Sequence, residues 1–457
     1  MMHTTFRMPA RRLLSTALVS CLMLAAAPNV MAQSANASLR GQVAGAQAGT
    51  EVTATNVATG TVRRGTIRAD GSYSLMGLDP GTYNVVANGQ TQKVTVTVAS
   101  TATLNFAGAA SSTPGSTAAT NLDTVNVVAP TLLQEVRTSE VGKTVSLQQI
   151  QTTPQVSRNF LEFADAVPGL IFTRDAKGNT SLRGGATNAD GTNVYIDGVG
   201  QKSYVKGGGV AGQSGSAGNP FPQLAIGEYK VISGNYKAEY GQVSSAAVTA
   251  ATKSGTNEFK GGAFYRYTDE DMRAKTPAER QGGKEKMVSA EKEYGFALGG
   301  PIIQDKAHFF VTYEAKDRSD ARQVVPGRQF AIEDLPARFQ EEARSTNNAP
   351  FKEDLYFGKL SWTPDASNLV ELTMKRREED ETTNIGGVNL ASYGTLKTGE
   401  ETRIDLRHQF NAENWLNDAH ITYEDASFAP RPINTTIGYK LFVPRRGEEL
   451  LDNPAME

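Results

Sequence analysis

Apolar and polar side chains alternate along seven segments in the second half of the chain. In "HFFVTYEAK" (308–316) Phe309, Val311, Tyr313 and Ala315 fall on one face of an extended chain, whereas Thr312, Glu314 and Lys316 fall on the other. The same pattern recurs at 259–267, 292–300, 355–363, 368–376, 402–410 and 419–425. Half-apolar strands about nine residues long are typical of a transmembrane β-barrel, whose strands face lipid on one side and a polar lumen on the other.

The connections between these segments fall into two length classes. Long charged stretches at 268–290, 317–353 and 377–400 alternate with short turns such as "PDAS" and "NAEN". Outer-membrane barrels alternate in the same way between long extracellular loops and short periplasmic turns. A secreted β-sandwich is the alternative, but it has no reason to sort its loops by length. We therefore predict that residues 256–457 form the first part of an antiparallel transmembrane β-barrel.

The segment before these strands is built from shorter strand candidates. Residues 33–108 contain six of them, separated by turns that include Asp70-Gly71 and Asn88-Gly89, and this spacing predicts a β-sandwich. The stretch that follows, "AASSTPGSTAATN" (109–121), is small and polar. Because it cannot bury enough apolar surface to fold, we expect a flexible tether there.

Residues 131–255 mix helix and strand signals. Ser146 is a candidate N-cap of a helix that stops before Pro154, and a second helical pattern runs through "SRNFLEFADAVPGL" (157–170). Strand patterns follow at "TSLRGG", "TNVYIDGV", "EYKVISG" and "SAAVTAATK". We predict a compact α+β domain.

The N-terminus carries an export signal. Arg7, Arg11 and Arg12 precede the apolar run "LLSTALVSCLMLAAAP", and we predict that residues 1–32 are a signal peptide ending in the small-residue site "VMA". Cleavage at "LVSC" before Cys21, as in a lipoprotein, is the alternative.

Charge limits the classes of partner, and hydropathy limits the ways in which the chain could enter a membrane. The chain has a formal charge of −2, and losing the three arginines of the signal lowers it to −5, which argues against nucleic acid as a partner. Beyond the signal there is no apolar run of the roughly 18 residues that a membrane helix needs. If the mature chain enters a membrane, it must therefore do so as a β-barrel.

Motifs for catalysis, cofactors and metals are missing from the sequence. Cys21 is the only cysteine, so the mature chain has no thiolate chemistry, and its histidines do not show the H-E-x-x-H spacing. "DAKGN" and "NADGTN" carry calcium-type oxygens but lack the closing glutamate of a calcium loop. The Gly-rich stretch 206–220 lacks the ending of a phosphate-binding loop. We predict no enzyme activity, no cofactor and no metal.

Two family resemblances follow from these motifs. "LRGQV" and "ADGSYSLMGLDPGTYNVV" resemble the carboxypeptidase regulatory-like domain, a transthyretin-like sandwich that also resembles some starch-binding modules; the name does not imply peptidase activity. Further motifs are "AVPGL" (166–170), "LRGG" (182–185), "VYIDGV" (194–199), "GNYKAEYGQ" through "TKSGTNEFKG" (234–261), and "GGPIIQDKAHFFVTYE". With these motifs, almost the whole mature chain resembles the TonB-dependent outer-membrane receptors, and among them the Oar-like subgroup that carries this sandwich.

The resemblance implies a role for the strand-like segment "LDTVNVVAP" (122–130). In that family a short TonB box precedes the plug, and the matching residues are Asp123, Thr124, Val125, Asn126 and Val127. The box would add itself to a sheet edge of TonB, an energy-coupling protein anchored in the inner membrane, and pulling on it would loosen the plug. The alternative is that this strand pairs within the plug or the sandwich.

The resemblance also marks residues of the plug motifs, which are Arg183, Gly184, Gly185, Asp197, Gly198, Tyr240 and Gly241. Asp197-Gly198 suits a tight turn with positive φ. Arg183 would make a buried ion pair that holds the plug, or would simply be solvated. The Gly-rich stretch 206–220 is expected to be a mobile loop near the ligand, or a plain flexible loop.

The predicted fold class is mainly β, with a signal (1–32), a sandwich (33–108), a linker with the TonB box (109–130), an α+β plug (131–255) and an incomplete barrel. Seven strands fall short of the roughly 22 of plugged transporters, and the chain ends without a terminal aromatic strand, so we expect a truncated reading frame or fragment.

The expected location is the Gram-negative outer membrane. The expected partners are TonB, outer-membrane lipid and an unidentified extracellular ligand, with a glycan or a peptide as candidates. The alternatives are a passive or adhesive barrel and a secreted carbohydrate-binding sandwich.

Overall fold

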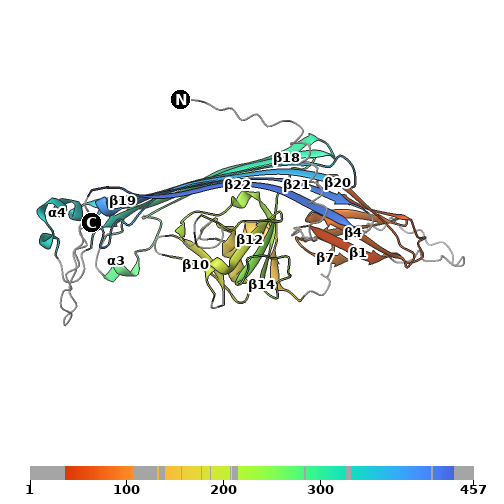
Figure 1. Cartoon of the computed structure of the whole chain (residues 1–457), viewed down its shortest axis with the longest axis horizontal. Helices are drawn as coiled ribbons and strands as arrows, with labels where there is room; N and C mark the ends of the chain where they lie inside the picture. The colour runs from red at the N-terminus through yellow and green to blue at the C-terminus, as the bar shows by residue number, and fades with distance from the viewer. Residues whose placement is uncertain are drawn as a thin grey trace, which may run out of the picture.

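The structure is a computed structural model, and it describes residues 36–106, 131–132 and 139–436, the last range with gaps at 156, 176–177, 186, 206, 208–214, 282–284, 326–330 and 413–414. The predicted signal, the tether and the TonB box lie outside the described residues. Figure 1 shows three units: a long curved sheet, an α+β unit against its concave side and a small sandwich at one end. We call them the long sheet, the plug unit and the sandwich.

The sandwich is built from two sheets, as predicted. One has the order β4 (Ser72–Leu78), β1 (Ala37–Gln42), β7 (Thr101–Thr103). The other has the order β3 (Val62–Thr66), β2 (Glu51–Asn56), β5 (Gly81–Ala87), β6 (Gln90–Val96), β8 (Thr131–Leu132). Alternate residues of both sheets fill a common core that includes Leu39, Val52, Ile67, Tyr73, Tyr83, Val94 and Phe106. The predicted Asn88-Gly89 turn has φ of 48° and 75°.

The last strand of the sandwich comes from a distant part of the chain. Thr131 and Leu132 pair in parallel with Val94 and Thr95 at the edge of the second sheet. The sequence places the start of the plug at residue 131, but these two residues belong to the sandwich sheet. The difference arises because strand addition to a free edge needs only two or three backbone groups and leaves no side-chain pattern.

The plug unit has a five-stranded sheet in the order β13 (Val199–Gly200), β12 (Thr192–Ile196), β15 (Ala246–Thr252), β14 (Ile226–Gly234), β9 (Val141–Val145). A hairpin of β10 (Leu170–Arg174) and β11 (Thr180–Gly184) lies beside it. Ser146 caps α2 (Leu147–Thr152) in a capping box with Gln149, as its position predicts. The second predicted helix is a 3-10 helix, Phe160–Ala166, capped by the Asn159 side chain.

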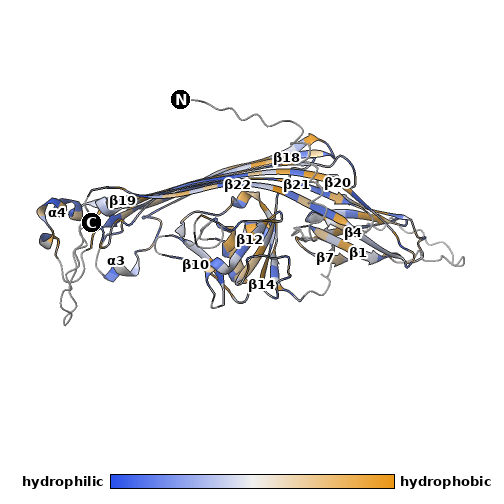
Figure 2. Ribbon diagram, viewed as in Figure 1, coloured by the Kyte–Doolittle hydropathy of each residue, from blue (hydrophilic) through white to orange (hydrophobic). Residues whose placement is uncertain are grey.

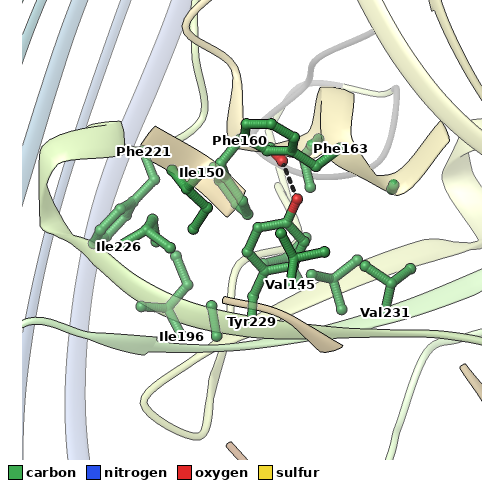
Figure 3. Packing of buried hydrophobic residues seen from close by; sticks show 14 of the residues in the cluster. Val145, Ile150, Phe160, Phe163, Ile196, Phe221, Ile226, Tyr229 and Val231 are labelled. Carbon is green, nitrogen blue, oxygen red and sulfur yellow. Dashed lines mark hydrogen bonds between the residues drawn. The ribbon is translucent and has the colours of Figure 1, made fainter. Parts of the chain in front are cut away.

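The core of the plug unit lies between this 3-10 helix and the sheet (Figure 3). The Phe160 and Tyr229 rings meet edge to face at 5.7 Å, and the Tyr229 hydroxyl donates to the Phe160 carbonyl oxygen at 2.8 Å. Both side chains are fully buried, so the phenol has the hydrogen-bond partner that a buried polar group needs. The predicted apolar stripe of this segment is therefore a core contact.

The long sheet has seven antiparallel strands in chain order. They are β16 (Lys260–Asp269), β17 (Ser289–Ile303), β18 (Ala307–Gln323), β19 (Thr346–Trp362), β20 (Asn368–Thr383), β21 (Thr395–Asn411) and β22 (Leu416–Pro432). All seven predicted strands are confirmed, but most run to 15–17 residues, so the predicted length of nine is wrong. In β17 to β22 the apolar alternation is concentrated in one half of the strand, and the other half is mainly polar on both faces.

Because the strands are longer than predicted, the long connections are shorter than predicted. They are still longer than the short turns. The long ones span 270–288, 324–345 and 384–394, and two of them carry the helices α3 (Pro277–Gln281) and α4 (Ala337–Arg344). The short turns span 304–306, 363–367 and 412–415. All the short turns lie at the end of the sheet where the sandwich is found, and α3 and α4 lie at the other end (Figure 1). No helix in the described part of the chain has the length and apolarity required to cross a membrane.

Hydrophobic and hydrophilic residues are interspersed along the strands of the long sheet (Figure 2). The two faces of the sheet differ in chemistry, as the alternation predicts. The outer face exposes apolar side chains, each 39–73% exposed, which include Tyr265, Phe296, Leu298, Val311, Tyr356, Leu360, Trp362, Leu372, Met374, Leu406, Ile421 and Tyr423. The inner face carries charged residues that are less than 10% exposed, among them Glu314, Glu353, Lys359, Glu371, Arg377 and Arg407. The long sheet thus reverses the usual arrangement, in which apolar side chains are buried and charged ones are exposed. Its buried charges need ion-pair or hydrogen-bond partners.

Candidate functional site

The turn after β12 carries a buried carboxylate of the plug unit. Asp197 has φ of 48° and Gly198 has φ of 90°, so the predicted positive-φ turn is confirmed. The Asp197 carboxylate accepts hydrogen bonds from the backbone N–H of Thr252 at 2.9 Å and from its hydroxyl at 2.5 Å. Turn geometry alone therefore does not account for Asp197, because its side chain is committed to a buried contact.

Asp197 connects the plug unit to a row of charges on the long sheet. The Lys359 ammonium lies 3.2 Å from Asp197 and 3.0 Å from Glu371 on the neighbouring strand. Arg407 continues the row with contacts of 3.0 Å to Glu371 and 2.7 Å to Asp418. Charges thus alternate in sign from the plug unit across β19, β20, β21 and β22.

Burial makes these charges depend on one another. Burial itself opposes ionisation of Asp197, but the Lys359 ammonium and the Thr252 donors hold the pKa of Asp197 below its ordinary value. Lys359 and Glu371 are each at most 5% exposed at the side chain, so water cannot replace a lost partner. The row therefore holds the plug unit in a defined position against the sheet.

A second contact forms where the Gly-rich stretch ends. Glu353 on β19 accepts from the backbone N–H of Asn219 at 2.8 and 2.9 Å and pairs with Arg377 at 3.1 Å. Arg377 also donates to the Ser216 hydroxyl at 2.8 Å. Gly218 packs against the Glu353 carboxylate so closely that a Cβ would overlap it.

This contact corrects the prediction for the described end of the Gly-rich stretch. Residues 216–220 are buried against the long sheet, where the sequence suggested a mobile or flexible loop. Glycine and small side chains serve here for close approach of backbone to a carboxylate. Loop flexibility and close packing select the same residue types, so composition could not separate them.

A third contact lies at the start of the 3-10 helix. Arg158 pairs with Glu314 on β18 at 3.3 Å and stacks over the Phe264 ring at 3.6 Å. The Glu314 carboxylate also accepts from the Leu224 N–H. On the far side of the plug unit, Arg403 donates to the Gly200 carbonyl oxygen. Carboxylates and guanidinium groups of the inner face thus take backbone and side-chain partners from four separate parts of the plug unit.

The remaining residues of the plug motifs are divided between two places. Tyr195 stacks on Tyr240 at 5.6 Å and donates to the Gly241 carbonyl oxygen, so the motifs "VYIDGV" and "GNYKAEYGQ" meet. Gly184 lies against β15, where a Cβ would be 2.6 Å from the Ser245 carbonyl oxygen. Gly185 has φ of 57°.

Arg183 is exposed on β11, so the solvated alternative describes it and the buried ion pair does not form. It lines an open cavity of about 640 Å³ together with Thr173, Ser181, Asn188 and Asp190. Among the charges that do fix the plug unit, Lys359 lies in a predicted barrel strand, whereas Glu353 and Arg377 lie in the predicted long connections 317–353 and 377–400. Alternation predicts which face a strand residue occupies but not which partner it meets.

The histidines have structural partners. Ring nitrogens of His308, His408 and His420 lie 2.9 Å from oxygens of Asn257, Asn368 and Asp405, respectively. Across the described residues, no group of three or more His, Cys, Asp or Glu side chains is arranged to hold a metal ion.

The plug unit also contacts the sandwich. The backbone N–H of Val98 donates to the Glu228 carboxyl group at 2.9 Å, and Val98 packs on Ala251. Burial raises the pKa of Glu228 to about 7, although the Val98 hydrogen bond works in the opposite direction. Glu228 is on β14 and Ala251 is on the central strand β15, so the sandwich contacts two strands of the plug sheet.

This contact is expected to depend on pH. Because the pKa of Glu228 is raised from 4.5 to about 7, the contact is strongest below about pH 4.5 and weakens as pH rises through 7. Hydrogen exchange at the Val98 amide, corrected for the intrinsic effect of pH, should therefore accelerate over this range. Glu228→Gln, which cannot ionise, should make the corrected exchange rate independent of pH; an unchanged pH profile in that variant would contradict the assignment.

Comparison with known proteins identifies this arrangement. Residues 135–248 match the family described as TonB-dependent Receptor Plug Domain, and residues 251–328 match the Outer membrane beta barrel domain. The chain is 27% identical over 161 residues to the TonB-dependent transporter Oar of Myxococcus xanthus, covering 34% of this chain and 14% of the relative.

One solved structure supports a similar fold. The outer-membrane transporter YddB of Escherichia coli matches with a TM-score of 0.51 and 10% identity, over 66% of this chain and 42% of that one. The siderophore receptor PirA of Pseudomonas aeruginosa matches with a TM-score of 0.42 and 14% identity, over 64% and 42%. The chain spans about two fifths of the length of these proteins and a smaller share of Oar.

The class of protein is defined by a plug domain that packs against the polar face of an outer-membrane barrel sheet. The chain is a protein of the Gram-negative outer membrane, and its plug unit matches the plug domain of the TonB-dependent receptors. This is a family of receptors and transporters rather than enzymes.

Proposed function

We propose that the protein takes up an extracellular ligand, still unidentified, by an energy-coupled rearrangement of the plug unit. The observation that carries this proposal is the set of separate ion pairs, Asp197 with Lys359 and Arg158 with Glu314, that hold the plug unit on the inner face. An interface of discrete charged contacts can be released stepwise, whereas a continuous apolar core would resist sliding.

We infer that Asp123, Thr124, Val125, Asn126 and Val127 form the TonB box, and that TonB is the partner. The segment leads towards β9, which lies at the edge of the plug sheet and pairs only with β14 among the described strands. An edge strand can be separated from its sheet without breaking any other pairing. A pull on the box would therefore reach an edge strand of the plug sheet.

The same proposal assigns the parts of the chain. Residues 1–32 are the signal, 33–108 the regulatory-like sandwich, 109–130 the linker with the box, 131–255 the plug and 256–457 barrel. The exposed apolar band of the long sheet would face outer-membrane lipid. Arg183, Gly184, Gly185, Asp197, Gly198, Tyr240 and Gly241 would shape the plug, and we propose that the chain has no catalytic or cofactor site.

Deleting residues 123–127 tests the proposal. Binding of the purified periplasmic domain of TonB to the receptor in detergent should fall by about 100-fold or more, because the main-chain hydrogen bonds of an added strand are lost. Deleting residues 111–115 removes the same number of residues from the linker and should leave binding intact. Equal binding by both variants would favour a passive or adhesive barrel that is not coupled to TonB.

A further inference from the structure

The sandwich meets the long sheet through its loop after β2. The backbone N–H of Asn257 donates to the Ala58 carbonyl oxygen at 3.1 Å. Asn257 is in turn tied to the β17–β18 turn, because its side-chain amide donates to Asp305 at 2.6 Å and accepts from the Asp305 N–H at 2.8 Å. Gly60, with φ of 71°, packs on the Asp305 side chain. The sandwich thus contacts the first short turn of the sheet.

A second contact involves the end of β4. The Arg63 side chain is buried, and its guanidinium donates to Gly77 O at 3.3 Å and to Ala366 O, in the next short turn, at 3.4 Å. A Cβ on Gly77 would lie 2.7 Å from Gln409 Oε1 and 2.8 Å from Asn411 Nδ2 on β21. Gln409 is fully buried, so there is no free space for a side chain at Gly77.

The turn that follows Gly77 points towards the charge row that holds the plug unit. Burial, and then the Glu371 carboxylate, raise the pKa of Asp79, while Lys359 and Arg407 act on it in the opposite direction. These are the same groups that Asp197 approaches from the plug unit. The third contact is that of Val98 with Glu228 and Ala251, described above. The sandwich therefore touches both the short-turn end of the sheet and the plug sheet (Figure 1).

We propose that the sandwich is a docked cover of the short-turn mouth, which clamps β14 and β15 of the plug unit and has to detach before the plug unit can move. Three contacts of a few mostly polar groups are typical of an interface between domains that opens reversibly. The idea that detachment precedes movement rests on the proposed transport function, but the docking and the clamping do not.

The position of β8 connects this cover to the proposed pull. Thr131 and Leu132 follow the proposed box and pair with the β6 edge before the chain reaches β9. A force applied at residues 123–127 therefore acts first on the edge of the sandwich and only then on the plug sheet. The force therefore acts on this edge of the sandwich at the start of the pull, and two residue pairs offer it little resistance.

Docking can be tested by a disulfide between Ala58→Cys and Asn257→Cys, whose backbones are joined by a hydrogen bond. The natural Cys21 lies in the predicted signal. The control pair is Ala48→Cys with Asn257→Cys, because Ala48 precedes the opposite end of β2, roughly 20 Å away along a six-residue strand. In outer membranes with a mild oxidant, most of the first variant should cross-link and the control should not. Equal cross-linking in the two, or none in either, would overturn the docking.

Clamping can be tested with two glycines of similar backbone conformation. Gly77 and Gly89 have φ of 69° and 75°, but only Gly77 faces the long sheet, and Gly89 has open space around it. Gly77→Phe should accelerate hydrogen exchange in β14 and β15 by about tenfold or more, because the clamp is lost, while Gly89→Phe carries the same backbone strain without this effect. Equal exchange in the two variants would overturn the clamp.

The two experiments use neither TonB nor a ligand. Unchanged TonB binding after the box deletion would therefore remove the proposed function and leave the docked cover standing. Failure of both the cross-link and the exchange difference would remove the cover and leave the proposed function standing.

Discussion

Replacing Lys359 by methionine is expected to weaken the attachment of the plug unit to the long sheet by about 3–5 kcal/mol, the usual cost of removing one partner of a buried ion pair. Methionine keeps the length of the side chain but removes the ammonium. Asp197 and Glu371 then lose the charge that lies 3.2 and 3.0 Å from them. Both carboxylates are buried, so solvation cannot compensate for the loss.

Hydrogen exchange at the Thr252 amide measures this effect, because that N–H donates to Asp197. The matched control is Lys260→Met, which breaks a pair with Glu258 between side chains that are 64% and 78% exposed, and should change little. Asp197→Asn combined with Lys359→Met should recover part of the loss, since it removes the orphaned charge. If Lys359→Met left the Thr252 amide as protected as in the wild type, the charge row would not be what holds the plug unit.

Leu372→Arg is expected to destabilise the protein in a lipid bilayer by about 2–4 kcal/mol, the cost of an arginine on the lipid face near the bilayer midplane. Leu372 lies on the outer face between Leu360 and Leu406, with which it pairs across β19 and β21. All three side chains are more than 40% exposed. In a sheet surrounded by water, the same change would cost little.

The matched control is Leu396→Arg, because Leu396 has the same 41% exposure as Leu372. It lies in the polar half of β21, opposite Thr382 and Arg431, where a charge has polar neighbours. Urea unfolding from lipid vesicles should show a large shift for Leu372→Arg and at most about 1 kcal/mol for Leu396→Arg. Equal shifts would show that the apolar band does not face lipid.

Features with a local cause could be predicted from the sequence. The period of two placed the charged residues within the predicted strands, such as Glu314 and Lys316, on the correct side, since side chains of a strand alternate whatever lies opposite. Ser146 and Gln149 form a capping box because both partners lie within one turn of the helix. Asp197-Gly198 adopts positive φ for an equally local reason.

Partners distant in the chain were decided by tertiary structure. Asp197 and Lys359 are 162 positions apart, and nothing in either local sequence selects the other; the register of β19 and the turn after β12 bring them together. Arg183 lies in a motif and was the arginine that the sequence singled out. The contacts between the plug unit and the long sheet are instead made by Arg158 of the plug unit and by Arg377 and Arg403 of the long sheet. Likewise, the sequence divides the sandwich from the plug at residue 131, whereas strand pairing joins Thr131 to Val94. Periodicity and turn chemistry act over a few residues, but charge pairing and edge pairing depend on which surfaces the completed fold brings within a few ångströms.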